Sequence, residues 1–376
     1  MLYYFYVKVL ILSTSTGEGH NSAAKAIKEQ FDFKGIYSEI VDVLSFASKN
    51  TSRRSKDIYI WSTVKSKKAF KSAYIVGRLL SNSVLKSPVY YANALYSKKL
   101  CEYIKKNNFD SVVMPHLFPA EALTYLIRKR KLDVKTYFIA TDYTCIPFTE
   151  ETRADFYFIP HEDLIDEFNK RGVPLYKLVP YGIPVSNKFQ IDISKKDARE
   201  SLNMPIDSKC ILMMTGSMGY GNVSSLSEKL INNSDAYLYI MGGNNEELKN
   251  ELRTKYKDNN RVIVLDYTND THLYMKACDI LFTKPGGLTS SEALACNVPL
   301  VFTSPIPGCE ERNAKFFSER GMSIYNKNED LLIQEGIDLL NSLDKQERML
   351  TAQRVYRKID ASKDICEFII KRGHVW

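Results

Sequence analysis

The chain has 376 residues, of which 44% are hydrophobic and 26% charged, a composition that excludes a fibrous or disordered protein. Because a single hydrophobic core stops growing near ~250–300 residues, two domains are expected. No segment approaches the ~18 apolar residues of a membrane span, and no two of the seven cysteines have the spacing of a zinc or redox pair. The apolar residues 2–12 run into polar ones without a cleavage site, so a buried first strand and a cytoplasmic protein are expected.

The net charge of +8 is concentrated in one segment. Residues 53–99 contain eleven basic residues and a single acid, Asp57, which makes this segment +10 and the rest of the chain −2. Aromatic residues, among them Trp61 and Tyr74, are interleaved with these charges. Such a mixture suits an anionic membrane surface or a solvated pair of basic helices; it would also suit nucleic acid, but no recognised nucleic-acid motif accompanies it.

Short apolar runs alternate with helical patterns through the first half of the chain. Helices are predicted between the strands, and the clearest has Ala23, Ala24, Ile27 and Phe31 on one face. The predicted strands span residues 7–12, 38–43, 111–115, 136–141 and 156–160. The predicted helices span residues 21–31, 119–131 and 162–171. Strands that alternate with helices in this way indicate a parallel sheet covered on both faces.

The alternation restarts after residues 179–185, where two prolines and a glycine predict a linker. The strands predicted beyond it span residues 210–215, 236–241, 262–265, 280–283 and 300–302. We therefore predict an α/β protein with two similar halves. The predicted domains are residues 1–183, residues 184–345 and a pair of terminal helices at 346–376, which in two-lobed folds can return to the first domain.

A glycine-rich loop follows the first predicted strand. Residues 17–22 read Gly-Glu-Gly-His-Asn-Ser and resemble a dinucleotide fingerprint in which Ser22 replaces the third glycine, with Asp42 in the place of the ribose-binding acid. Nicotinamide binding is therefore one interpretation of this loop. His20 suits a general base, because an ordinary imidazole pKa near ~6.5 lets it accept a proton at neutral pH. The alternative is a helix N-terminal residue without a catalytic role.

Two more glycine-rich loops follow strands of the second half, at the edge where open parallel sheets bind ligands. Residues 215–222 carry three glycines and suit either a diphosphate cradle or a tight turn. Residues 283–293 read Thr-Lys-Pro-Gly-Gly-Leu-Thr-Ser-Ser-Glu-Ala. Thr289 or Ser290 is predicted to cap the following helix, with Glu292 in its first turn. A sugar diphosphate on the helix N–H groups, with Glu292 on the ribose diol, accounts for the Pro-Gly-Gly sequence as well.

A fourth loop, residues 305–313, reads Pro-Ile-Pro-Gly-Cys-Glu-Glu-Arg-Asn after the next strand. Its acids and its amide suit sugar hydroxyls, and a solvated helix start is the alternative. Together with Thr-Asp-Tyr at 141–143, the ordered set of motifs resembles the monogalactosyldiacylglycerol synthases and the bacterial diacylglycerol glucosyltransferases of glycosyltransferase family 28. The resemblance covers nearly the whole chain, and it is the order of the motifs that makes it specific.

This resemblance implies a GT-B fold, in which two Rossmann-like domains face each other across a cleft. The C-terminal domain would bind UDP-galactose or UDP-glucose, and the N-terminal domain would bind diacylglycerol and dock on the membrane. The hexose would be transferred with inversion to give a β-glycolipid. His20 would be the base, with Asp142 as the competing candidate. The implied donor-binding residues are Gly216, Ser217, Gly219, Tyr267, Gly286, Gly287, Thr289, Ser290, Glu292, Glu310 and Asn313.

The resemblance also gives the basic segment a role as an acceptor-loading surface, with Gly19, Trp61, Lys67, Lys68 and Lys71 as its candidate residues. The expected partners are an anionic membrane surface and diacylglycerol, on the inner face of the cell membrane. The chain lacks the Asp-x-Asp motif of metal-dependent sugar transfer, so neither a metal site nor an obligatory cofactor is expected.

Cys309 departs from the family, which usually has Gln there and thus a better hydrogen-bonding group for a hexose. Three alternatives share the fold. They are a transferase of N-acetylglucosamine to a lipid-linked precursor, a UDP-sugar epimerase, and a membrane-docked UDP-sugar sensor without turnover.

Overall fold

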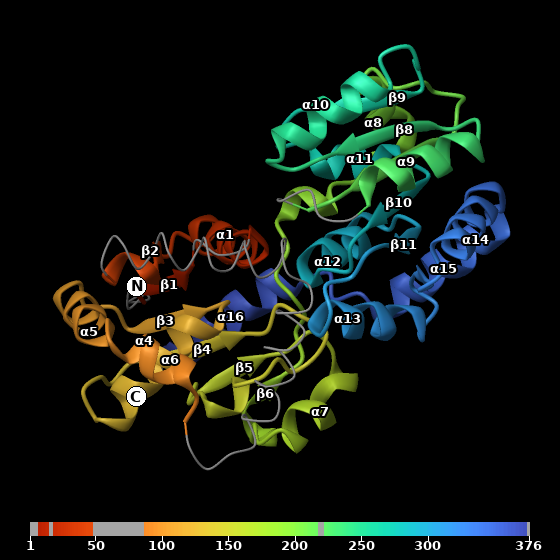
Figure 1. Cartoon of the computed structure of the whole chain (residues 1–376). Coiled ribbons are helices and arrows are strands. Elements are labelled where there is room, and N and C mark those ends of the chain that lie inside the picture. The colour runs from red at the N-terminus through yellow and green to blue at the C-terminus, as the bar shows by residue number, and fades with distance from the viewer. Residues whose placement is uncertain (1–6, 15–17, 48–85, 217–221, 374–376) are drawn as a thin grey trace. The chain divides into compact units, whose positions relative to one another are not determined.

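The computed structural model describes residues 7–14, 18–47, 86–216 and 222–373. The chain divides into two compact units (Figure 1). Unit 1 comprises Met1–Ser186, Pro307–Cys309 and Lys358–Trp376, and unit 2 comprises Asn187–Ile306 and Glu310–Arg357. None of the helices in the described ranges is long and apolar enough to cross a membrane.

Unit 1 is built on a six-stranded parallel sheet of order β2-β1-β3-β4-β5-β6. The strands are β1 (Val9–Ser13), β2 (Ser38–Asp42), β3 (Ser111–Met114), β4 (Lys135–Ile139), β5 (Phe156–Phe158) and β6 (Leu178–Val179). The helices are α1 (Glu18–Phe33), α4 (Pro88–Ala94), α5 (Ser97–Lys106), α6 (Leu117–Arg128), α7 (Ile165–Lys170) and α16 (Ala361–Gly373). The central strands are almost entirely buried, as their near-continuous apolar sequences predict.

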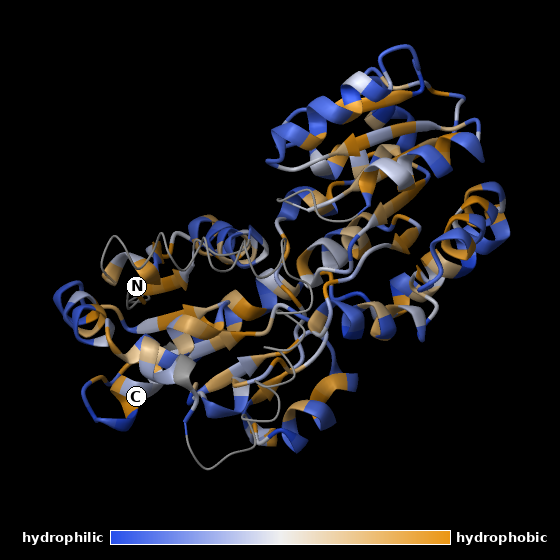
Figure 2. Ribbon diagram, in the orientation of Figure 1, coloured by the Kyte–Doolittle hydropathy of each residue, from blue (hydrophilic) through white to orange (hydrophobic). Residues whose placement is uncertain are grey.

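Unit 2 repeats this architecture with a six-stranded parallel sheet of order β12-β11-β10-β7-β8-β9. The strands are β7 (Cys210–Met214), β8 (Tyr237–Met241), β9 (Val262–Leu265), β10 (Ile280–Thr283), β11 (Leu300–Phe302) and β12 (Ile324–Tyr325). The helices are α8 (Lys195–Ser201), α9 (Val223–Asn232), α10 (Glu246–Lys255), α11 (Thr271–Ala277), α12 (Gly287–Cys296), α13 (Cys309–Ser318), α14 (Glu329–Asn341) and α15 (Leu343–Tyr356). In Figure 2 the strands of both sheets are mostly orange, and the surrounding helices carry most of the blue.

The last helix, α16, belongs to unit 1, although the chain reaches it from unit 2. Ile365, Cys366 and Ile369 are fully buried in one cluster with Phe31 of α1 and Tyr137 of β4. In Figure 1 the blue α16 accordingly lies among the red and yellow elements of unit 1. The final helix therefore supplies part of the core on which the first helix packs.

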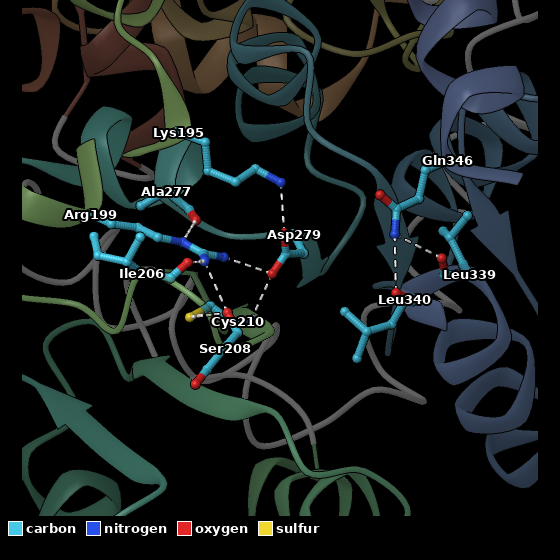
Figure 3. Close-up of polar contacts among 10 residues, drawn as sticks. All are labelled: Lys195, Arg199, Ile206, Ser208, Cys210, Ala277, Asp279, Leu339, Leu340 and Gln346. Carbon is cyan, nitrogen blue, oxygen red and sulfur yellow. Dashed lines mark hydrogen bonds and ion pairs between the residues drawn. The ribbon is translucent and has the colours of Figure 1, made fainter. Parts of the chain in front are cut away.

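The boundary before this helix differs from the sequence prediction. Unit 2 extends to Arg357 rather than to residue 345, so α15 belongs to it. Gln353 of α15 is fully buried and donates to the carbonyls of Val298 and Met322, each 3.0 Å away. Gln346 of α15 donates to the carbonyls of Leu339 and Leu340 at the end of α14 (Figure 3). These contacts bind α15 to unit 2.

Two short strands were not predicted from the sequence. β6 lies where the linker was predicted to begin, and β12 was not predicted at all. Each has two residues, too few to show a period, and each pairs at the edge of its sheet. They are recognised as strands only by their pairing with the neighbouring strand.

Candidate active site

The carboxyl ends of β1, β3 and β4 bring three loops together around His20. These strands are neighbours in the sheet, and their parallel course places their following loops on one edge. His20 is the third residue of α1 and is half-buried. Its Nδ1 lies 2.8 Å from the carbonyl oxygen of Pro115 and 3.0 Å from Oγ1 of Thr141. Residues from three separate parts of the sequence thus meet at one imidazole.

The Pro115 carbonyl determines which nitrogen of His20 carries the proton. A carbonyl oxygen only accepts hydrogen bonds, so Nδ1 of His20 is the donor and Nε2 keeps its lone pair. Burial lowers the pKa of His20 from 6.5 to about 4, and the hydrogen bond to Pro115 opposes this shift. His20 is therefore neutral at physiological pH, and its Nε2 is unprotonated and able to accept a proton.

His116 is a second histidine of this site and is not among the residues predicted from the sequence. Its ring lies edge-on to His20, with the centroids 4.4 Å apart. Nδ1 of His116 accepts from the backbone N–H of Phe118, 3.0 Å away, and so caps the start of α6. Burial, and then the neighbouring His20, hold the pKa of His116 well below 6.5. Its position directly after a predicted strand was the available signal.

The remaining candidates of unit 1 lie at the same edge or outside the described ranges. Asp142 follows Thr141 in the loop after β4 and is half-buried, and Gly19 precedes His20 in α1. Asp42, which suggested a dinucleotide site, accepts a hydrogen bond from the Leu44 N–H and caps the short helix that follows β2. The acceptor-surface candidates outside the described residues are Trp61, Lys67, Lys68 and Lys71.

Unit 2 collects the predicted donor loops at the carboxyl ends of β7, β10 and β11. These three strands are neighbours in its sheet. Gly216, two residues after β7, has a φ of +74°, and Gly287 begins α12 after β10, with Gly286 in the capping position. Tyr267 follows β9, further along the same edge, and is 74% exposed. Ser217 and Gly219 lie outside the described residues.

The start of α12 differs from the predicted cap. The helix begins at Gly287 with Gly286 in the capping position, and no side chain caps it. Ser290 is fully buried and its hydroxyl donates to the Gly286 carbonyl, so the predicted cap by Thr289 or Ser290 is wrong. The helix starts three or four residues earlier than expected, which moves Glu292 out of the first turn. Because Gly286 has no side chain, the capping position supplies no acceptor to the first N–H groups of α12, which form a potential anion site.

Glu292 lies in α12 beyond this helix start and is half-buried. Burial raises its pKa from 4.5 to about 8, while the charge of Lys188 acts in the opposite direction. A carboxyl group with such a pKa is easily converted between its neutral and ionised forms near neutral pH. Perturbed groups of this kind are more frequent at functional sites than elsewhere, although structural sites have them too.

Glu310 and Asn313 of α13 hold the β10 and β11 loops together. Glu310 Oε1 lies 2.8 Å from Nζ of Lys284, and its Oε2 accepts from the Ile306 N–H, also at 2.8 Å. Asn313 is fully buried, and its Nδ2 donates to the Pro285 carbonyl over 2.9 Å. Both side chains are thus engaged within unit 2. From the sequence, Lys284 was recognised only as part of the Thr-Lys-Pro-Gly-Gly motif, and no role was predicted for it.

The model of the monogalactosyldiacylglycerol (MGDG) synthase family matches residues 20–185, and that of the glycosyl transferases group 1 matches residues 217–355. A processive diacylglycerol beta-glucosyltransferase of Staphylococcus saprophyticus is 28% identical over 98% of this chain and 94% of its own length. One of Bacillus cereus is 25% identical over 94% and 92% of the two chains.

Solved structures share the fold. MurG of Acinetobacter baumannii aligns with a TM-score of 0.64 and 14% identity over 96% of this chain and 99% of its own. MnaA of S. aureus, solved with UDP, aligns with a TM-score of 0.66 and 15% identity over 98% and 97% of the two chains. The family resemblance and the GT-B fold inferred from the sequence are therefore confirmed. This chain is a glycosyltransferase of GT-B fold, related to the monogalactosyldiacylglycerol synthases and the diacylglycerol glucosyltransferases.

Proposed function

We propose that this protein transfers glucose from UDP-glucose to the free hydroxyl of diacylglycerol and forms a β-glycolipid. The similarity to diacylglycerol beta-glucosyltransferases over nearly the full chain supports both the acceptor and glucose rather than galactose. The structural observation that carries the proposal is the neutral imidazole of His20, whose Nδ1 proton is bound by the Pro115 carbonyl. A base of this kind is what an inverting transfer requires.

The proposed reaction is a single displacement. Nε2 of His20 takes the proton of the acceptor hydroxyl while the oxygen forms a bond to the anomeric carbon of glucose. The bond from that carbon to the diphosphate oxygen breaks, and its electron pair leaves with UDP. The open N–H groups at the start of α12 would stabilise the developing charge, and Glu292 would bind the ribose. Asp142, next to Thr141 in the chain, is the alternative base.

The basic segment would hold the enzyme at an anionic membrane surface. The part of this segment that the structure describes is consistent with that role. Tyr91 in α4 is 59% exposed, and Leu95, directly after α4, is 87% exposed. Lys98 and Lys99 of α5 are also exposed. Basic residues close to anionic lipid contribute about 1 kcal/mol each, and aromatic side chains favour the interface. We place the protein on the cytoplasmic face of the membrane, where UDP-sugars are available as soluble donors.

The proposal is tested by a turnover assay. Vesicles of diacylglycerol with phosphatidylglycerol would receive the purified protein and radiolabelled UDP-glucose, UDP-galactose or UDP-N-acetylglucosamine in separate reactions. We expect label in the lipid extract from UDP-glucose, sensitive to a β-glucosidase, and less product on vesicles of neutral lipid. Mass spectrometry of the product would count the sugars added.

The matched control is His20→Ala, for which we expect about a hundredfold loss of turnover, typical for removal of a general base, with UDP binding unchanged. Donor binding without any lipid product would contradict the proposal and favour a sensor. Product from UDP-galactose or UDP-N-acetylglucosamine alone would retain the transferase but replace the sugar.

A further inference from the structure

Lys284 crosses the turn that follows β7. It comes directly after β10, and a quarter of its side chain is exposed. A Cβ atom added at Gly216 would lie 2.7 Å from Cε of Lys284 and 3.6 Å from its Nζ. The positive φ favours glycine at this position, and a side chain there would also have to displace the end of Lys284. The ammonium group of Lys284 is thereby placed beside Gly216, two residues after β7.

Glu310 fixes this ammonium group from the other side. Its carboxylate is 6% exposed and uses both oxygens, one for Nζ of Lys284 and one for the Ile306 N–H. An unpaired carboxylate at such a depth would be costly, so the lysine and the glutamate stabilise each other. A Cβ at Gly286 would lie 3.8 Å from Oε1 of Glu310, which places the pair next to the start of α12. Loops from three neighbouring strands therefore converge on Nζ.

The chemistry of this point suits a phosphate group. A lysine ammonium has three N–H donors, and one of them is taken by Glu310. The others can bind oxygens of an anion that lies beside Gly216 and the N–H groups at the start of α12. Glu310, with both oxygens engaged and little exposed surface, is poorly placed to bind a sugar hydroxyl.

We infer that Lys284 is the cation that binds the donor diphosphate, and that Glu310 is a positioning residue that acts through Lys284 rather than a ligand of the hexose. This inference rests on the proposed use of a UDP-sugar. When the bond from the anomeric carbon to the diphosphate oxygen breaks, the electron pair stays on that oxygen and the diphosphate gains negative charge. The ammonium group binds the leaving group more strongly than the bound donor, so its position affects turnover as well as affinity.

The experiment compares UDP with uridine, because only UDP carries the group that Lys284 would bind. Affinities by titration calorimetry and turnover would be measured for the wild type, Lys284→Met, Glu310→Gln and the double variant. For Lys284→Met we expect UDP to bind about ten- to a hundredfold more weakly, the range for loss of a charge-assisted hydrogen bond, with uridine affinity within about twofold. Lys209→Met, at the opposite end of β7, is the charge-matched control and should leave both affinities unchanged.

Glu310→Gln should lower kcat about tenfold, because the neutral amide no longer holds the Lys284 ammonium group in position. UDP binding should not weaken, because the amide also no longer competes with the diphosphate for that ammonium group. The double variant should resemble Lys284→Met alone, since Glu310 acts through the lysine. If Glu310 contacts the hexose, its substitution will instead raise the KM for UDP-glucose and add to the effect of Lys284→Met. That result would overturn the role given to Glu310.

The role of Lys284 fails if Lys284→Met binds UDP as tightly as the wild type. Should the methionine variant not fold, Lys284→Gln removes the same charge and decides the question. An inactive wild type that binds UDP would refute the proposed transfer, whereas the comparison of UDP with uridine would still decide whether Lys284 binds the diphosphate.

Discussion

At the scale of single residues, His20 makes a prediction for the pH dependence of turnover. The imidazole must be unprotonated to act as a base, and its pKa lies at about 4 rather than 6.5. We therefore expect kcat, measured at saturating UDP-glucose, to stay constant as the pH falls from 7 to about 5 and to decline only near the lowered pKa. The check is a pH–rate profile of the wild type. A decline centred near 6.5 would mean that His20 is solvated in the working enzyme or that another group is the base.

Glu292 makes a second prediction at this scale. Its pKa of about 8 implies that its ionised form grows between pH 6.5 and 8.5, and an ionised carboxylate is the better acceptor for two ribose hydroxyls. We expect uridine to bind more tightly as the pH rises over this range. Glu292→Gln should abolish the pH dependence and weaken binding about tenfold. Calorimetric titration with 2′,3′-dideoxyuridine is the control, and an equal pH response for both nucleosides would contradict the assignment.

At the scale of elements, Arg199 of α8 joins the segments that precede β7 and β10 (Figure 3). Its guanidinium is almost fully buried, pairs with Asp279 at 2.8 Å and donates to the carbonyls of Ile206, Ser208 and Ala277. Asp279 in turn accepts from the Cys210 N–H at the start of β7. This network lies at the amino ends of β7 and β10, opposite the donor loops, so it affects stability rather than donor binding.

Arg199→Lys should destabilise unit 2 by about 3 kcal/mol, because a lysine cannot reproduce the planar set of donors and leaves buried carbonyls unpaired. Lys195→Met is the matched control: Lys195 pairs with the same aspartate at 2.6 Å but is half exposed, and its loss should cost less than about 1 kcal/mol. Urea unfolding followed by circular dichroism measures both. If Arg199→Lys destabilised unit 2 no more than Lys195→Met does, the buried hydrogen bonds of Arg199 would not be what stabilises this corner.

At the scale of the whole molecule, the assignment of α16 to unit 1 can be tested by the unfolding of each unit. Ile369 is fully buried among residues of α1 and the first sheet. Ile369→Ala should destabilise unit 1 by about 2–5 kcal/mol and leave unit 2 unchanged. We expect a calorimetric scan with two transitions, of which UDP raises only that of unit 2. If Ile369→Ala instead lowered the temperature of the transition that UDP raises, the assignment of α16 to unit 1 would be contradicted.

Local patterns determined much of this protein from the sequence. Buried parallel strands are recognisable in the sequence as short apolar runs. A glycine-rich turn before a helix is likewise recognisable from its own residues, without knowledge of what packs against it. The order of the loops around His20, Thr141, Glu292 and Glu310 was sufficient for the family resemblance. The predicted ends of helices were less accurate than the predicted elements themselves. Capping propensity favours Thr289 or Ser290 before α12, but the helix begins at Gly287, directly after Gly286 and without a side-chain cap.

The tertiary structure alone decided the contacts between distant residues. His20 meets Pro115 and Thr141 across 95 and 121 positions in the sequence, and only the order of the strands brings their loops to one edge. Lys284 and Glu310 pair across 26 positions because β10 and β11 are neighbours. The sequence by itself therefore determined the kinds of elements and the chemistry of the loops, since both are local properties. The protonated nitrogen of His20, the partners of Glu310 and the place of α16 depend on packing, which no local pattern encodes.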